Sequence, residues 1–115
     1  MRLLLALTVL WLAPAAAEPL FAPPVADFHW SPMALRAGDV ATFVSTGYSP
    51  ASMLLLYQWE FPEEETETRV LDGSTQRAFP RAGSYVVTHH VMDATGGRAS
   101  VTRIVTVYNL SLIHI

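Results

Sequence analysis

The chain contains no cysteine among its 115 residues. Disulfides, thiolate metal sites and thiol nucleophiles are therefore excluded, as is a lipid anchor on cysteine. Lysine is absent as well, because all seven basic residues are arginine, and the formal net charge is −3. The arginines form no dense basic stretch, and binding to phosphate needs a clustered positive surface. We therefore predict no nucleic-acid partner.

Long apolar runs are almost missing. Residues 3–12 form one after a positively charged start at Arg2, and small residues follow at 14–17. The run is shorter than the roughly twenty apolar residues that a membrane-spanning helix needs. This pattern predicts a signal peptide over residues 1–17, cleaved after Ala17, no membrane span, and a secreted, periplasmic or cell-surface location. An uncleaved anchor or a buried helix is the alternative.

The remainder, roughly ninety residues, has room for one domain. Residues 18–24 are rich in proline and predict an extended lead-in. From Val25 onward, short segments of alternating polarity recur about every ten residues between turn residues, which is typical of an antiparallel β-sandwich. We expect strands at 25–30, 40–45, 53–61, 76–79, 84–92 and 99–108. A helical turn over residues 51–56 is an alternative to the start of the third.

Period-two alternation assigns an inward face to each segment. In the third strand this face carries Leu55, Tyr57, Trp59 and Phe61. The predicted structural core is made of large apolar side chains from five segments. Its members are Phe28, Phe43, Tyr57, Trp59, Phe61, Phe79, Tyr85, Val87 and Val91.

Two motifs identify a family resemblance. Tyr57-Gln58-Trp59-Glu60-Phe61 is followed by Gly83-Ser84-Tyr85-Val86-Val87-Thr88, and then by a Gly-rich turn after Asp93. Their order and spacing resemble the polycystic kidney disease (PKD) domain. The resemblance implies an all-β fold, an immunoglobulin-like antiparallel β-sandwich of about seven strands over residues 25–108. It also implies that Trp59 is buried and that Tyr85 is a corner tyrosine bonded to the backbone.

The sequence departs from this family after Phe61. Pro62-Glu63-Glu64 stands where the family pattern has Gly-Asp-Gly, so the turn must differ, because proline and glutamate do not readily adopt positive φ. The resemblance therefore implies no role for this turn.

The resemblance implies a non-catalytic exported module that mediates protein or carbohydrate contacts or spaces other domains. No nucleophile elbow and no phosphate-binding glycine loop is present in the sequence, so we predict neither an enzyme nor a cofactor. The alternative is an amino-terminal accessory domain of a truncated secreted protease or glycosidase whose catalytic domain is missing. The candidate contact residues are Tyr48, Met53, Glu63, Glu64 and Glu65.

The acidic segment leaves two interpretations open. A hard cation such as Ca²⁺ prefers several converging carboxylate oxygens, but the spacing of Glu63, Glu64 and Glu65 matches no calcium loop, and a solvated loop is favoured. We predict no metal site. His89 and His90 are adjacent on a strand and so point to opposite faces, which prevents them from binding one ion together. His89 is expected to be buried, neutral and hydrogen-bonded.

Residues 109–115 do not fit the domain. Their last six letters resemble the translation of a sequencing adapter, and we expect a non-native or truncated tail beyond which the natural protein continues with further domains. A genuine continuation of the last strand, or the start of a linker, is the alternative.

Overall fold

The computed structural model describes residues 21–62 and 64–109. The predicted signal peptide, residues 18–20 of the lead-in, Glu63 and residues 110–115 lie outside the described residues. Across the described ranges the chain forms strands and connecting turns, and no helix there is long and apolar enough to cross a membrane.

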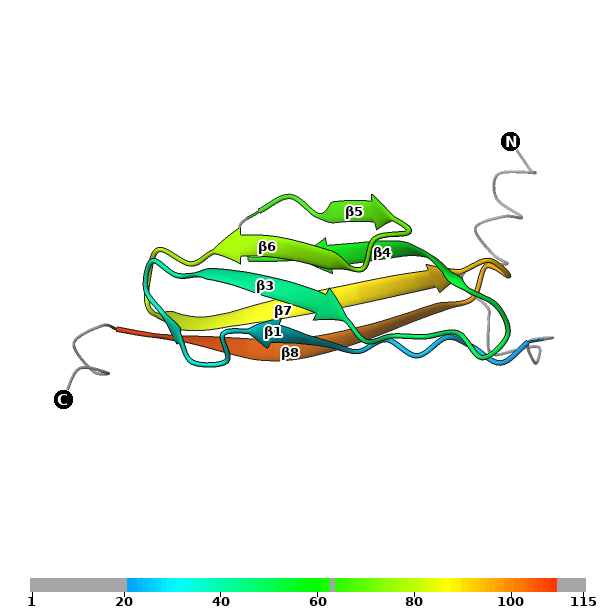
Figure 1. Ribbon diagram of the computed structural model, residues 1–115, viewed down its shortest axis with the longest axis horizontal. Helices are drawn as coiled ribbons and strands as arrows, with labels where there is room; N and C mark the ends of the chain where they lie inside the picture. The colour runs from blue at the N-terminus through cyan, green and yellow to red at the C-terminus, as the bar shows by residue number, and fades with distance from the viewer. Residues whose placement is uncertain (1–20, 63, 110–115) are drawn as a thin grey trace, which may run out of the picture.

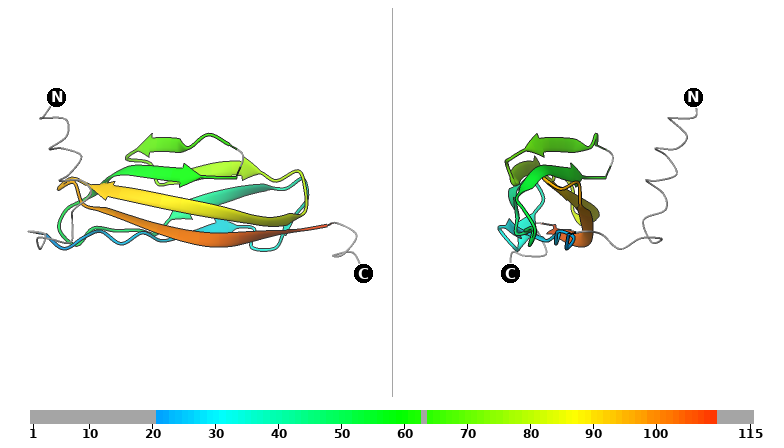
Figure 2. Two further views of the ribbon diagram at one scale, coloured as in Figure 1. Left: turned by 180° about the vertical axis from the view of Figure 1, so that it is seen from behind. Right: turned by 90° about the vertical axis from the view of Figure 1, so that its right-hand side faces the viewer.

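The described chain forms a β-sandwich of two facing sheets (Figures 1 and 2). One sheet has the order β1-β3-β6 and the other has the order β2-β8-β7-β4-β5. All neighbouring strands are antiparallel except β2, which pairs in parallel with β8. The strands are β1 Phe28–Ser31, β2 Leu35–Arg36, β3 Val40–Ser45, β4 Leu54–Glu60, β5 Glu67–Val70, β6 Ser74–Ala78, β7 Gly83–Asp93 and β8 Arg98–Tyr108.

This architecture confirms the predicted all-β sandwich and adds two strands to the expected segments. β2 has two residues, too few to show an alternation of polarity. β5 lies in the acidic segment, where its charged and polar side chains concealed a strand at the sheet edge.

The core lies between the sheets and is rich in aromatic rings. Trp59 of β4 is fully buried and meets the Phe28 ring edge-on, with centroids 5.3 Å apart and planes at 81°. Phe43 of β3 lies 5.9 Å from the same indole. Aromatic side chains remove large apolar areas from water, so this cluster stabilises a domain that has no disulfide among its residues. The buried apolar residues are Phe28, Leu35, Ala41, Phe43, Leu54, Trp59, Phe61, Phe79, Val87, Val91, Val105 and Val107.

The beginning of β4 differs from the predicted alternation. Leu54 is buried, whereas Leu55, expected to point inward, is only half-buried. The pairing of β4 with β7 shifts between Leu54 and Leu56, and such an irregularity moves side chains to the other face. The helical-turn alternative is wrong for residues 54–56, which are strand. Tyr57 is also half-buried, so it belongs to the rim of the core rather than to its centre.

The corner tyrosine has the expected arrangement. The Tyr85 hydroxyl donates a hydrogen bond of 2.6 Å to the carbonyl of Arg81, and its ring lies 4.9 Å from that of Phe79. The phenol thus ties the start of β7 to the chain before it, while its ring remains packed against the core.

Candidate functional site

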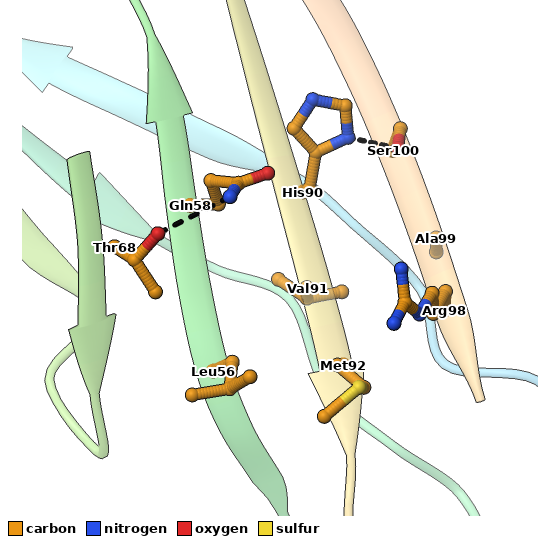
Figure 3. A pocket seen from close by; sticks show the side chains of 9 residues that line it. All are labelled: Leu56, Gln58, Thr68, His90, Val91, Met92, Arg98, Ala99 and Ser100. Carbon is orange, nitrogen blue, oxygen red and sulfur yellow. Dashed lines mark hydrogen bonds between the residues drawn. The ribbon is translucent and has the colours of Figure 1, made fainter. Parts of the chain in front are cut away.

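The outer face of the five-stranded sheet carries a shallow depression of about 290 Å³ (Figure 3). Alternation along the strands explains its lining. Because Trp59 and His89 point into the core, Gln58 and His90 point to the outer face. The pairing register then places one polar residue from each of four strands in a continuous row across the sheet. This polar row consists of Thr68 of β5, Gln58 of β4, His90 of β7 and Ser100 of β8.

Hydrogen bonds hold the polar row in order. The Gln58 amide donates to the Thr68 hydroxyl at 3.1 Å, and His90 Nδ1 lies 2.5 Å from the Ser100 hydroxyl (Figure 3). His90 Nε2 lies 2.7 Å from a carboxylate oxygen of Glu60. Both nitrogens of the imidazole are therefore engaged, which restricts the ring to one orientation.

Aliphatic side chains border the polar row on one side. Leu56 and Met92 pair across β4 and β7 and lie in the same depression (Figure 3). The site thus combines amide, hydroxyl and imidazole groups with an apolar strip. Ligand sites typically consist of apolar walls with a few placed polar groups. This arrangement suits a ligand that has hydroxyl or amide groups and one apolar face.

The contacts from Ser100 to His90 to Glu60 also match the side chains of a nucleophile, a base and an acid. Acyl transfer additionally needs hydrogen-bond donors directed at the developing oxyanion. The amide of Gln58 is the neighbouring side-chain donor in the polar row, and it is bonded to Thr68. Gln58 and Arg98 both supply N–H donors to this depression.

The structure separates the contact residues that the sequence predicted. Tyr48 and Met53 are exposed, each at 57%, in the loop between β3 and β4. Glu64 and Glu65 are exposed in the loop after β4, at the other end of that strand (Figure 1). Neither pair lines the depression. Glu63 lies outside the described residues.

The acidic segment is engaged with arginine. Arg77 of β6 contacts Glu64 at 2.8 Å and Glu67 at 2.9 Å, and Arg69 of β5 contacts Glu67 at 2.8 Å. Glu67 also accepts a hydrogen bond from Thr75 at 2.8 Å. These contacts link β5 of one sheet to β6 of the other. No group of three or more His, Asp or Glu residues is placed to hold a metal ion within residues 21–62 and 64–109.

The arginines also determine the charge state of Glu67. Burial alone would raise the pKa of its carboxyl, but hydrogen bonds from Arg69 and Thr75 and the nearby charge of Arg77 outweigh this effect. The pKa of Glu67 is therefore lowered, and the carboxylate stays ionised in its ion pairs. A carboxylate held in this way is a poor calcium ligand, since it would have to leave its partners.

Asp93 organises the loops near Tyr48 and Met53. Its buried carboxylate accepts hydrogen bonds from the Ser49 hydroxyl at 2.8 Å, the Thr95 hydroxyl at 2.6 Å and the Gly97 amide at 2.8 Å. The bond from Thr95 is the main reason that the pKa of Asp93 is lowered. A buried carboxylate with several donors is stably ionised, so it joins the β3–β4 loop to the β7–β8 turn.

Sequence reasoning did not find the polar row. Gln58 and Glu60 belong to the family motif, and alternation along the strand indicates of His90 only that it points away from His89. Alternation along β4 and β7 does predict which of their side chains point outward. It does not predict which outward side chains are neighbours, because that depends on how the strands pair.

Comparisons with known proteins identify the fold. No protein-family model matches the sequence, and no curated protein matches it. A solved structure from work on the promiscuous specificity of carbohydrate-binding modules of the β-sandwich superfamily aligns with 80% of this chain, at a TM-score of 0.72 and 22% identity. This chain spans 37% of the length of that structure.

PKD domains also align with the chain. The PKD1 domain of the Vibrio cholerae metalloprotease PrtV matches 76% of this chain and 99% of its own, with a TM-score of 0.63 and 24% identity. The PKD domain of the human VPS10 domain-containing receptor SorCS2 matches 82% of this chain and 80% of its own, with a TM-score of 0.64 and 18% identity. The predicted resemblance is confirmed at the level of the immunoglobulin-like fold.

Proposed function

We propose that this chain, which has the fold of a PKD domain, is a non-catalytic exported module that holds a glycan on the outer face of its five-stranded sheet. The observation that supports this proposal is the polar row of Thr68, Gln58, His90 and Ser100 beside the apolar strip of Leu56 and Met92. The proposal includes export behind the predicted signal peptide.

The chemistry of a sugar matches this surface. A sugar ring has hydroxyl groups around its edge and C–H groups on its faces, so it needs both hydrogen-bonding groups and an apolar contact. The amide of Gln58 and the hydroxyls of Thr68 and Ser100 supply the first, and Leu56 with Met92 supply the second. The structural neighbour from the work on carbohydrate-binding modules favours the same reading.

The test is a glycan array probed with the purified chain, followed by titration calorimetry of the glycans that bind. We expect Gln58→Ala to weaken binding by about fivefold, the equivalent of one lost hydrogen bond. Gln76→Ala is a matched control, because Gln76 makes the same amide-to-threonine contact with Thr42 at 3.2 Å on the other sheet. This control should bind as tightly as the unaltered chain.

Two results contradict the proposal. One is the absence of any glycan ligand, and the other is equal weakening by Gln58→Ala and Gln76→Ala. Capture of a protein that is lost in Gln58→Ala would instead assign the same face to protein contacts.

A second candidate is an accessory or spacing domain of a secreted hydrolase. It is favoured by structural neighbours that are PKD domains of a metalloprotease and of an M14-like peptidase. The described chain enters the sandwich at one end and leaves it at the opposite end (Figure 1), which suits a spacer between domains. Sequencing of the uninterrupted open reading frame tests this candidate, and a stop codon directly after Asn109 would contradict it.

A further inference from the structure

One long edge of the sandwich has little backbone pairing. β8 pairs with β7 from Arg98 to Val107 on one side. On its other side the pairing covers only Val107 and Tyr108, which meet the two residues of β2. Within the described ranges, residues 98–106 of this edge therefore have no strand hydrogen-bonded beside them, and β8 runs along the lower side of the sandwich in Figure 1.

Two hydrogen bonds show which backbone groups face this edge. The amide of Ala37 donates to the carbonyl of Tyr108 at 2.9 Å, so that carbonyl points away from β7. The amide of Asp93 donates to the carbonyl of Gly97 at 2.9 Å, so that carbonyl points toward β7. Because the direction alternates along a strand, the N–H and C=O groups of Ser100, Thr102 and Ile104 point to the open edge.

Side-chain contacts support this assignment. Residues that exchange no backbone hydrogen bonds with their partner strand bring their side chains closest together. Thr102 and Thr88 have their hydroxyl oxygens 3.0 Å apart, and Ser100 contacts His90 at 2.5 Å. Both pairs therefore behave as non-hydrogen-bonded pairs, as the direction of the backbone groups requires.

The charged side chain that could protect this edge from pairing is engaged in an ion pair within the same chain. Exposed edges are commonly guarded by charged side chains or proline, and Arg103 is the charged residue near the middle of the open stretch. Its guanidinium is paired with Asp27 and lies 5.8 Å from the centre of the Phe28 ring. The arginine is thus neutralised and held against the sandwich.

We propose that β8 is a self-association edge, through which two copies of this chain pair antiparallel about a two-fold axis at Thr102. Thr102 then lies opposite Thr102 of the second copy, and Ser100 lies opposite Ile104 on either side. In each of these pairs the two residues exchange both backbone hydrogen bonds. The two five-stranded sheets become one continuous sheet across the axis.

A second copy fits this edge because the residue at the centre of the open stretch, Thr102, offers its backbone groups to a partner strand. The stretch covers residues 98–106, and Thr102 is at its centre with its backbone groups directed outward. Antiparallel pairing about this residue covers the whole stretch and leaves β2 of each copy at an end of the joined strands. No like charges meet, since Arg103 lies opposite Val101.

The test is sedimentation equilibrium of the purified chain over a range of concentrations. Thr102→Asp and Thr102→Lys each place like charges directly opposite on the axis and should weaken dimerisation by about fivefold. An equimolar mixture of the two variants places opposite charges there and should restore association. Only an axis at residue 102 predicts this restoration.

Thr102→Pro provides a second, independent test. It removes an N–H that points to solvent, so the pairing with β7 is retained while association weakens by about tenfold or more. Thr102→Val, which also loses the contact with Thr88 but keeps the N–H, should dimerise like the unaltered chain. A monomer at every concentration, or a mixture of the charged variants that stays monomeric, overturns the proposal.

Discussion

At the residue scale, His89 shows how a titratable group is incorporated into this core. The side chain is fully buried and stacks on Trp59, with ring centroids 3.8 Å apart. Its Nδ1–H donates to the carbonyl of Gln58 at 3.0 Å, because a carbonyl can only accept. In the neutral ring Nε2 then accepts from the hydroxyl of Ser45 at 2.9 Å, which connects the two sheets. The expectation of a buried, hydrogen-bonded histidine is confirmed.

His89 makes the stability of the domain dependent on pH. Burial lowers its pKa from 6.5 to about 4, despite the opposing bond to Gln58. As pH falls through 6.5 the unfolded chain takes up a proton and the folded chain does not, so stability is lost until the pH reaches about 4. We expect the free energy of unfolding to decrease by about 2 kcal/mol between pH 7.5 and 5, measured by urea denaturation.

Two variants separate this effect from other titrations. His89→Leu should remove the pH dependence in this window, at the cost of a lower stability at pH 7.5, since Ser45 and Gln58 lose their partner. His90→Gln should retain the dependence, because it leaves unchanged the burial of His89, which is the main cause of its lowered pKa. An unfolding free energy that stays constant from pH 7.5 to 5 in the unaltered chain contradicts a neutral, buried His89.

At the element scale, the turn between β5 and β6 contains a residue with a strained backbone conformation. Leu71 has a φ of 60°, a region that non-glycine residues other than asparagine and aspartate seldom occupy. Its amide donates to the carbonyl of Leu55 at 2.8 Å, and its side chain is 60% exposed. The backbone bond to β4 holds the strained conformation while the side chain contributes little burial.

Leu71→Asn should therefore stabilise the domain. Asparagine tolerates the left-handed region, and little apolar contact is lost, so we expect a gain of about 0.5 to 1 kcal/mol in thermal denaturation. Leu71→Ala removes the same side chain without relieving the backbone and should give no gain. Equal melting temperatures for the two variants would show that this turn stores no strain.

At the scale of the whole molecule, both sheets contribute to one core. Phe43 of the three-stranded sheet and Trp59 of the five-stranded sheet are fully buried against each other. Small domains with a single core usually unfold in one cooperative step. The ion pair between Glu67 and Arg77 also joins the two sheets at one edge and so favours cooperative unfolding.

We expect tryptophan fluorescence and far-ultraviolet circular dichroism to report the same urea transition. Phe43→Ala should lower the unfolding free energy by about 3 to 5 kcal/mol and shift both signals together. Val44→Ala, on the outward face of the same strand, should change it by about 0.5 kcal/mol or less. A fluorescence transition that precedes the loss of strand signal would show two units instead of one.

The fold was largely predictable from local patterns. Alternation along residues 84–92 indicated which side of β7 faces inward, and the structure buries Val87, His89 and Val91 there. The motif around Trp59 and the corner at Tyr85 indicated a sandwich of the PKD type, because turn residues and period-two polarity are properties of short segments.

The candidate site depended on tertiary structure. Thr68, Gln58, His90 and Ser100 are distant in sequence and become neighbours only through the pairing of four strands. Tertiary structure also decides three further features: the register shift at Leu54, the ion pair of Glu67 with Arg77 and the open edge of β8. The amino-acid order determines which face a side chain takes within its own strand. Which side chains then lie beside it depends on strand register, and this register results from packing the whole core at once.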